Sequence, residues 1–418
     1  MQDATAEKIS MAHFVVFAAM LPFNRLYSEL ALVSLLIHTL IHLDRKQLKN
    51  IYRTDFLLST AGIYLLTCIW TIGSTHLQQA FFEWEIQLAL LLFPFILTVN
   101  PIPLKNYSDT IILVMGISCT VAIVYLYGES FRVILFYHLP FSSLYTDAFI
   151  NHNFSLPLDL HATYFSLYIA LSLMAFLYQQ LYAGKTRFRK LRICCIPVLV
   201  AGLVQLSSKS VLIAVCILLL FVLPLQLPLR KRIIFLVVSL CLCGCAVILV
   251  SANKDLRNRY FRDLVSDLCV ANQNPQQLAP RALRWKTGWE LIQTAPFLGH
   301  GSGAEIAELK QLYFKHHLYN AYINELNVHN QYLSFLIKTG IPGLLLYLLV
   351  LTRAYRLAVR RKDLVLLSFL VLITITGLSE NILDVNKGIF FVAFFFSLFY
   401  FSNKEPFIVG KDQAWFQK

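Results

Sequence analysis

Long apolar stretches recur along this 418-residue chain and decide what it can fold into. Each runs for roughly 14 to 22 residues, and a helix needs about 20 to cross the hydrocarbon core of a membrane. With 57% hydrophobic and only 14% charged residues, the chain has more apolar surface than a soluble core buries. We therefore predict an all-α polytopic membrane protein of about 12 transmembrane helices, near residues 9–23, 28–43, 56–74, 86–99, 109–127, 161–181, 193–208, 211–228, 233–252, 331–352, 364–378 and 388–402.

Lysine and arginine gather in four short segments between these stretches, as is typical of cytoplasmic loops. All four fall on one side of the predicted membrane, which puts both ends of the chain in the cytoplasm. The net charge of +13 is therefore largely a topology signal, and binding to nucleic acid is excluded because no basic soluble domain is predicted. The segments contain Arg45, Lys46, Lys49 and Arg53; Lys185, Arg187, Arg189, Lys190 and Arg192; Arg230, Lys231 and Arg232; and Arg353, Arg356, Arg360, Arg361 and Lys362.

Two segments on the opposite, periplasmic side are too long and too polar to be simple turns. Residues 128–160 are net acidic, whereas residues 253–328 are net basic and contain nine lysines and arginines. A long loop escapes the positive-inside bias, so its cations need another role, of which attraction to anionic lipid headgroups is the simplest. The predicted organisation is nine helices in 1–252, a large periplasmic loop with short helices in 253–328, three helices in 329–402 and a cytoplasmic tail in 403–418.

The basic loop contains a predicted helix over residues 280–290 that opens with a proline, a favoured residue in the first turn. Arg281 and Arg284 share a face of this helix, and two guanidinium groups there form a plausible clamp for a diphosphate. The glycine-rich turn over 296–303 is predicted to be structural, although its amides could also face an anion. Residues 304–326 suggest an amphipathic helix along the membrane surface.

His329 stands where this polar segment meets a long apolar stretch. An imidazole titrates near neutral pH and can take a proton from a sugar hydroxyl at a membrane surface. We therefore expect His329 to act as a general base, with an anchoring role at the helix end as the alternative. Glu380 and Asp384, in the last outward turn, are expected to contact the basic loop.

Five sequence blocks resemble the O-antigen ligase family of integral membrane glycosyltransferases. The most specific is His329-Asn330, nine residues, Gly340, two residues and Gly343, which is similar to the family's His-Asn-x9-Gly-x-x-Gly pattern. Together the blocks cover about the last 260 residues in the family's order. The others are Arg281 to Trp285 with Pro296 to Gly303, His161 to Tyr164, Ser207 to Ser210, and Ser379 to Asp384.

This resemblance implies a GT-C-like fold and a metal-independent, inverting transfer at the periplasmic face of the bacterial inner membrane, with no cofactor. A glycan would leave undecaprenyl diphosphate and be captured by a hydroxyl of the lipid A core. In that reaction His329 would accept the hydroxyl proton and Arg281 would offset charge on the diphosphate.

The resemblance also implies substrate-binding residues around these two. They are Lys209, Arg284, His161, Tyr164 and Asn330. The family usually carries arginine where this chain has Lys209, and lysine keeps the charge but loses the paired hydrogen bonds.

Two other functions stay open at this point. A polysaccharide polymerase of the same superfamily would handle two polyprenyl diphosphates, and we would expect a second cation-rich outer loop, whereas residues 128–160 are net acidic. A twelve-span transporter would be expected to place ionisable groups near the bilayer midplane and to show similar halves, and neither feature is evident in the sequence.

Overall fold

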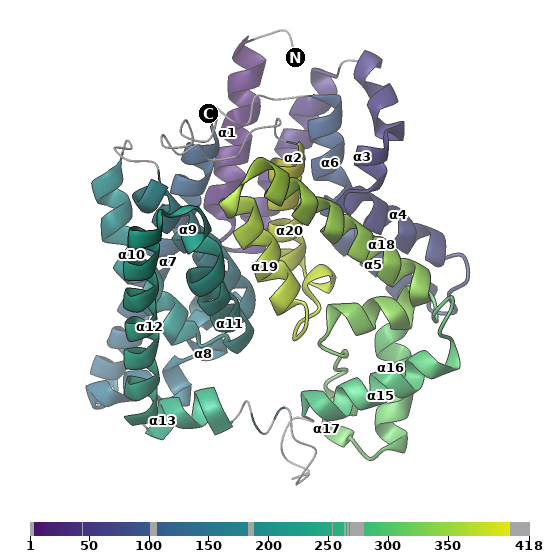
Figure 1. Cartoon of the computed structure of the whole chain (residues 1–418). Helices are drawn as coiled ribbons and strands as arrows, with labels where there is room; N and C mark the ends of the chain where they lie inside the picture. Colours follow the sequence, from purple (N-terminus) through teal and green to yellow (C-terminus); the bar gives the residue numbers. More distant parts are fainter. Residues whose placement is uncertain are drawn as a thin grey trace.

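The computed structural model describes residues 4–43, 45–100, 107–182, 188–252, 254–262, 265, 267 and 280–401. Within these residues every regular element is helical, which confirms the all-α prediction. The long helices form a bundle, and α15 to α17 extend from one of its ends (Figure 1).

Except for α5, which lies between two predicted apolar stretches, the bundle helices overlap the predicted stretches in position. They are α1 (Ala4–Met20), α2 (Arg25–Ile41), α4 (Thr60–Trp70), α5 (Leu77–Gln87), α6 (Ala89–Val99), α7 (Ser108–Phe136), α9 (Ala162–Tyr182), α10 (Arg189–Leu206), α11 (Lys209–Ile217), α12 (Leu229–Ala252), α18 (Gln331–Arg361), α19 (Leu364–Thr376) and α20 (Asn386–Phe401). Short elements connect them: η1 (Arg45–Tyr52), α3 (Thr54–Leu57), η3 (Phe141–Tyr145), η4 (Asp147–Phe149), α8 (His152–Ser155), η5 (Leu156–Leu158), η6 (Leu218–Val222), η7 (Leu223–Gln226), α13 (Lys254–Arg257), η8 (Asn258–Arg262), α15 (Arg281–Thr294), α16 (Ala304–Lys315), α17 (Tyr319–Ile323) and η9 (Ile382–Asp384).

Length and composition support fewer membrane spans than the predicted twelve. Among the described residues five helices are long and apolar enough to cross a membrane, or seven if two bent helix pairs each form one span. The helices α4, α19 and α20 are apolar but shorter. A multi-pass membrane protein is therefore supported, whereas the number of about twelve spans stays a prediction.

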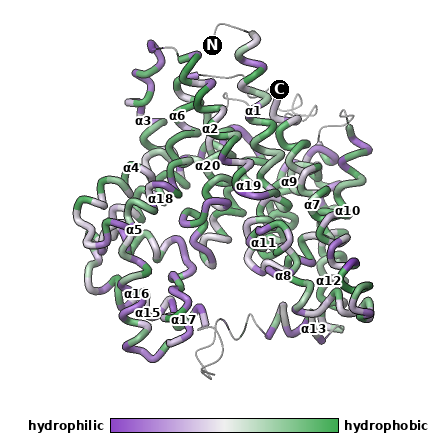
Figure 2. Tube along the Cα trace, turned by 180° about the vertical axis from the view of Figure 1, so that it is seen from behind, coloured by the Kyte–Doolittle hydropathy of each residue, from purple (hydrophilic) through white to green (hydrophobic). Residues whose placement is uncertain are grey.

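Burial separates the apolar helices into central and peripheral ones. The apolar window of α9 is 94% buried inside the protein, whereas that of α12 is only 6% buried. A helix that is apolar all round and uncovered by protein requires an apolar solvent, so α12 is suited to face lipid. Hydrophobic residues dominate the bundle, and hydrophilic residues gather around α15 to α17 (Figure 2).

Contacts between distant segments define the two ends of the bundle. At one end Arg353 pairs with Asp55 at 2.8 Å, and the Gln226 side chain donates to the Lys362 carbonyl at 2.7 Å. At the other end the indole of Trp70 donates to the Leu298 carbonyl at 2.7 Å. We call the first the arginine end and the second the loop end, where α15 to α17 lie.

Two predicted segments differ from the structure. Residues 128–160 are not a single loop, because α7 continues to Phe136 and holds the Glu129–Arg132 ion pair on its surface, before four short helical elements. The predicted surface helix over 304–326 is two helices, α16 and α17. Leu309 and Tyr313 of α16 are fully buried against α15 and α18, so protein covers them.

Helix α18 is broken at Gly340, whose φ of 63° and ψ of −157° are not helical. A Cβ at Gly340 would lie 2.3 Å from the carbonyl oxygen of Phe297, so only glycine fits beside the glycine-rich turn.

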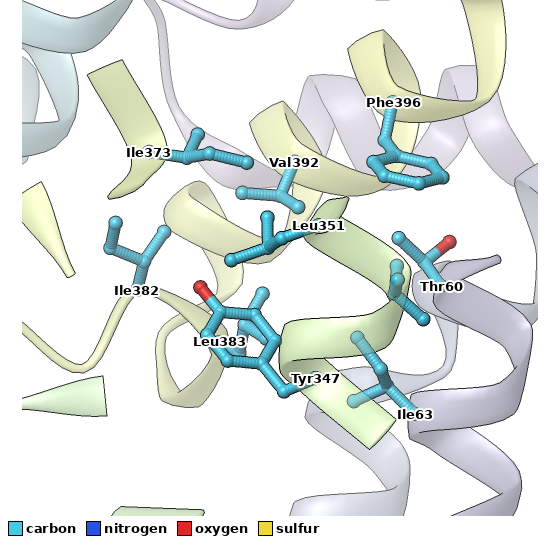
Figure 3. Close-up of a pocket in the computed structure, with 10 residues that line it drawn as sticks. Thr60, Ile63, Tyr347, Leu351, Ile373, Ile382, Leu383, Val392 and Phe396 are labelled. Atoms are coloured by element: carbon cyan, nitrogen blue, oxygen red, sulfur yellow. The ribbon is translucent and has the colours of Figure 1, made fainter. Parts of the chain in front are cut away.

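Beyond the break, α18 packs tightly between its neighbours. Figure 3 shows Tyr347 and Leu351 of α18 against Thr60 of α4, Ile373 of α19 and Phe396 of α20. The cavity between them has room for about 10 Å³, so no substrate enters here.

Candidate active site

Glu380 joins the two residues that were predicted to be catalytic. One carboxylate oxygen lies 3.1 Å from a terminal guanidinium nitrogen of Arg281, and the other lies 3.2 Å from Nδ1 of His329. Arg281 is the first residue of α15, and Glu380 follows α19. The expected contact between Glu380 and the basic loop is therefore present, and it brings a cation and an imidazole to one carboxylate.

The carboxylate of Glu380 is buried but charged. Burial raises its pKa, whereas the hydrogen bond and charge of His329, together with nearby cations, lower it to about 2. An ionised carboxylate accepts hydrogen bonds only, so Nδ1 of His329 carries a proton. In the tautomer that has this single ring proton, the lone pair is on Nε2.

The backbone at His329 is held in an uncommon conformation. Its φ is 49°, in the left-handed region that side-chain-bearing residues rarely adopt. Three successive amides fix it: Val328 donates to Glu305 at 3.0 Å, His329 to the Asn327 side chain at 3.0 Å, and Asn330 to the Asn381 side chain at 2.8 Å. Strain of this kind persists where surrounding contacts over-determine it, often at functional sites.

Glu305 of α16 lies at the centre of this support. The side chain is 2% exposed, and one of its oxygens accepts both from the Val328 amide and, at 3.1 Å, from the Asn381 side chain. Val328 precedes His329 and Asn381 follows Glu380. Glu305 therefore fixes the two backbones that carry the His329–Glu380 pair.

Glu305 also belongs to a second ionic cluster, which is centred on Lys338. The ammonium group of Lys338 lies 2.8 Å from Glu83, 2.9 Å from Asp384 and 3.6 Å from Glu305. Asp384 was expected to contact the basic loop, but its salt bridge is to this lysine on α18. The cavity beside the cluster has room for about 10 Å³, and within the described chain no group of histidine, cysteine or acidic residues is arranged to hold a metal ion.

Buried donors without partners gather on α15. They are Nε of Arg281, Nε of Arg284 and the indole nitrogen of Trp285. Arg284 is only 6% exposed, and burial together with the charge of Arg281 lowers the pKa of its guanidinium group. Arg281 also pairs with Asp267 at 2.8 Å, so two carboxylates already match its charge, whereas the desolvated guanidinium group of Arg284 is suited to an anion such as a phosphate.

His161 lies close to the Glu380 cluster. Burial lowers the pKa of His161 to about 4, and the negative charge of Glu380 opposes this only in part. The ring is therefore neutral at pH 7, and its buried Nδ1 has no hydrogen-bond partner. Tyr164 packs on the same ring, 4.9 Å between centroids, and its hydroxyl donates to the Asn381 carbonyl at 3.5 Å.

Two other predicted substrate residues occupy different positions. Asn330 caps α18: its side-chain oxygen accepts from Tyr332 and Leu333, and its amide donates to the Leu378 carbonyl at 3.1 Å. These bonds give Asn330 a structural role, and a substrate role stays a prediction. Lys209 is the half-buried first residue of α11, a helix that packs against α9 and α19, and its place in the site also stays a prediction.

The glycine-rich turn does not present its amides to a ligand. His300 and Gly301 donate to the carbonyls of Ile337 and Lys338 at 2.8 and 2.9 Å, and Gly303 donates to the Glu83 carboxylate at 3.0 Å. The structural prediction for this turn is confirmed. It joins the loop to the broken helix α18.

Some loop cations have protein partners. Lys310 pairs with Glu325 at 2.6 Å, and Lys315 pairs with Glu290 at 3.2 Å. Attraction to lipid headgroups is therefore not needed to explain these two.

Sequence reasoning missed Glu83, Glu305, Lys338 and Asn381. Lys338 lies inside the tenth predicted span, and an ionisable residue within an apolar stretch was the signal that could have revealed the cluster.

Residues 194–348 match the family described as O-antigen ligase. The matched segment contains Lys209, Arg281, Glu305, His329 and Lys338, whereas His161 and Glu380 lie outside it. No curated protein matches the chain.

Proposed function

Because residues 194–348 match the O-antigen ligase family, we propose that this chain is an O-antigen ligase. It transfers a glycan from undecaprenyl diphosphate to a hydroxyl of the lipid A core, at the periplasmic face of the bacterial inner membrane. The observation that carries this proposal is the meeting of His329 and Arg281 on one buried carboxylate, Glu380.

His329 is the general base in this proposal. With its proton on Nδ1 directed at Glu380, Nε2 accepts the proton of the acceptor hydroxyl as that oxygen attacks the anomeric carbon. The ionised Glu380 orients the ring and stabilises the imidazolium that forms. The bond from the anomeric carbon to the diphosphate oxygen breaks from the opposite side, so the configuration inverts.

Arg281 and Arg284 assist the departure of the diphosphate. As the glycosidic bond breaks, its electron pair passes to the leaving oxygen, and negative charge grows there. The unpartnered guanidinium nitrogens of α15 and the indole nitrogen of Trp285 are donors suited to that charge. Lys209, His161 and Tyr164 complete the substrate site in this proposal.

A deletion strain separates the ligase from the polymerase of the same superfamily. For a ligase, we expect core-only lipopolysaccharide while the finished polymer accumulates on its polyprenyl carrier. Core capped by a single repeat unit would instead identify a polymerase.

Metal independence is tested on the purified protein. Activity should survive chelation by EDTA, since neither polar segment of the sequence contains an Asp-x-Asp pair. Loss of turnover that manganese or magnesium restores would contradict the mechanism.

A further inference from the structure

A cleft at the arginine end of the bundle has no role in the proposed transfer. Its volume is about 530 Å³, and α18, α20 and the segment around Asp55 line it. Four of the eight lining residues are arginines and one is an aspartate, an excess of three positive charges. The remaining residues are Leu357, Tyr400 and Phe401.

The arginines follow one another along α18. Arg353, Arg356 and Arg360 are spaced by three and four residues, so they form a row over two helical turns, about 10 Å long. Arg353 is held by Asp55 at 2.8 Å, and Arg361 donates to the Phe399 carbonyl at 2.8 Å. Arg356 and Arg360 are exposed at the cleft.

By composition, the segment that follows α20 does not supply the missing negative charge. Residues 402–418 contain Lys404, Lys411 and Lys418 against Glu405 and Asp412, so this segment is not acidic. Repulsion among like charges along one row disfavours the cleft unless an anion is bound. The composition of the cleft therefore points to a ligand from outside the chain.

We propose that this cleft binds the headgroup of an anionic phospholipid with two phosphodiesters. Guanidinium forks match phosphate oxygens in pairs, and a row of about 10 Å accommodates two phosphates. Leu357, Tyr400 and Phe401 supply an apolar wall beside the cations, as a lipid needs and a free phosphate does not. Basic pockets between helices on the cytoplasmic side of a membrane bind such headgroups.

This proposal is independent of the transfer reaction, since the cleft and the His329–Glu380 pair lie at opposite ends of α18. An anionic lipid there would hold the end of α18 against α20. The positive-inside rule alone explains why arginines are present at this end, but it does not require that they line a common cleft.

The test is a titration of the purified full-length protein with cardiolipin, followed by native mass spectrometry. Arg356→Gln combined with Arg360→Gln should weaken binding roughly tenfold to hundredfold, because each change removes a charge-assisted hydrogen bond. Arg230→Gln combined with Lys231→Gln is the control, since it removes the same charge from exposed residues on the same predicted side. This control should bind like the wild type.

Three outcomes would overturn the proposal. The first is equal binding of cardiolipin by both double variants, which would show that the lipid is attracted only by the overall positive charge of this end. The second is equal binding of phosphatidylcholine, which has no net charge. The third is competition by inorganic pyrophosphate at the concentration of the lipid, which would make this a site for a free anion. Thermal midpoints of the variants in detergent should not fall below that of the wild type, because the changed side chains are exposed and removing like charges relieves their repulsion.

Discussion

Two ionic clusters lie side by side at the loop end, and they differ in exposure. In the first, Glu380 holds Arg281 and His329, whose side chains are each 25% exposed. In the second, Lys338 is 10% exposed among Glu83, Glu305 and Asp384. The first can meet a substrate, whereas the second is closed. In the proposed mechanism, similar residue types serve chemistry in the first cluster and structural support in the second.

The largest expected effect is at His329. The variant His329→Ala should lower transfer by roughly 10²- to 10⁴-fold, because the acceptor hydroxyl loses its general base. Turnover of a defined lipid-linked donor at matched protein amounts measures this. His316→Ala is the control, since His316 also contacts a glutamate, Glu290 at 2.6 Å. A His329→Ala protein as active as the control would show that the first cluster is not catalytic.

Substitutions in the second cluster should change the free energy of unfolding of the protein. Lys338→Met leaves buried carboxylates without their cation and should destabilise the protein by about 3–5 kcal/mol. Lys310→Met removes a lysine from an exposed pair with Glu325 and should leave the stability of the protein nearly unchanged, because water and salt screen such a pair. Thermal or denaturant unfolding in detergent compares them. Equal losses would mean that the Lys338 cluster is not a structural unit.

Arg281→Lys tests paired hydrogen bonding in the first cluster. The change keeps the charge but loses the fork, and transfer should fall roughly tenfold to hundredfold. The same change at the exposed Arg257 of α13 should have little effect. If both variants fall alike, the loop cations act only by general attraction.

The smallest expected effect is at Glu305, which connects the two clusters. Glu305→Gln keeps an oxygen for the Val328 amide but replaces the other acceptor with a donor, so the His329 backbone shifts slightly. We expect kcat to fall about tenfold with KM for the donor unchanged. Glu308→Gln, one turn away and paired with His76, should leave both constants unchanged. A change confined to KM would contradict a positioning role for Glu305.

The sequence predicted the helical class, the helix at Arg281 and the contact of Glu380 with the loop. Local patterns in the sequence predict these features: the length of the apolar stretches, a proline at the start of a helix, and charged residues in a short turn. The Glu305–Lys338 cluster was missed because it joins α5, α16, α18 and η9, and no local pattern records such a meeting. The break in α18 at Gly340 was not predicted, because the φ of Gly340 depends on the turn packed against it.

The hydrogen bonds between the glycine-rich turn and α18 bear on how the chain is assembled. A helix break leaves carbonyl groups without intrahelical partners, which is unfavourable in lipid. Here the amides of His300 and Gly301 satisfy the carbonyls of Ile337 and Lys338. Because residues 300 and 301 precede α18 in the chain, the ribosome synthesises the donor amides before the acceptor carbonyls. The turn is therefore already synthesised when α18 enters the membrane, and the insertion of that helix is coupled to the folding of the segment before it.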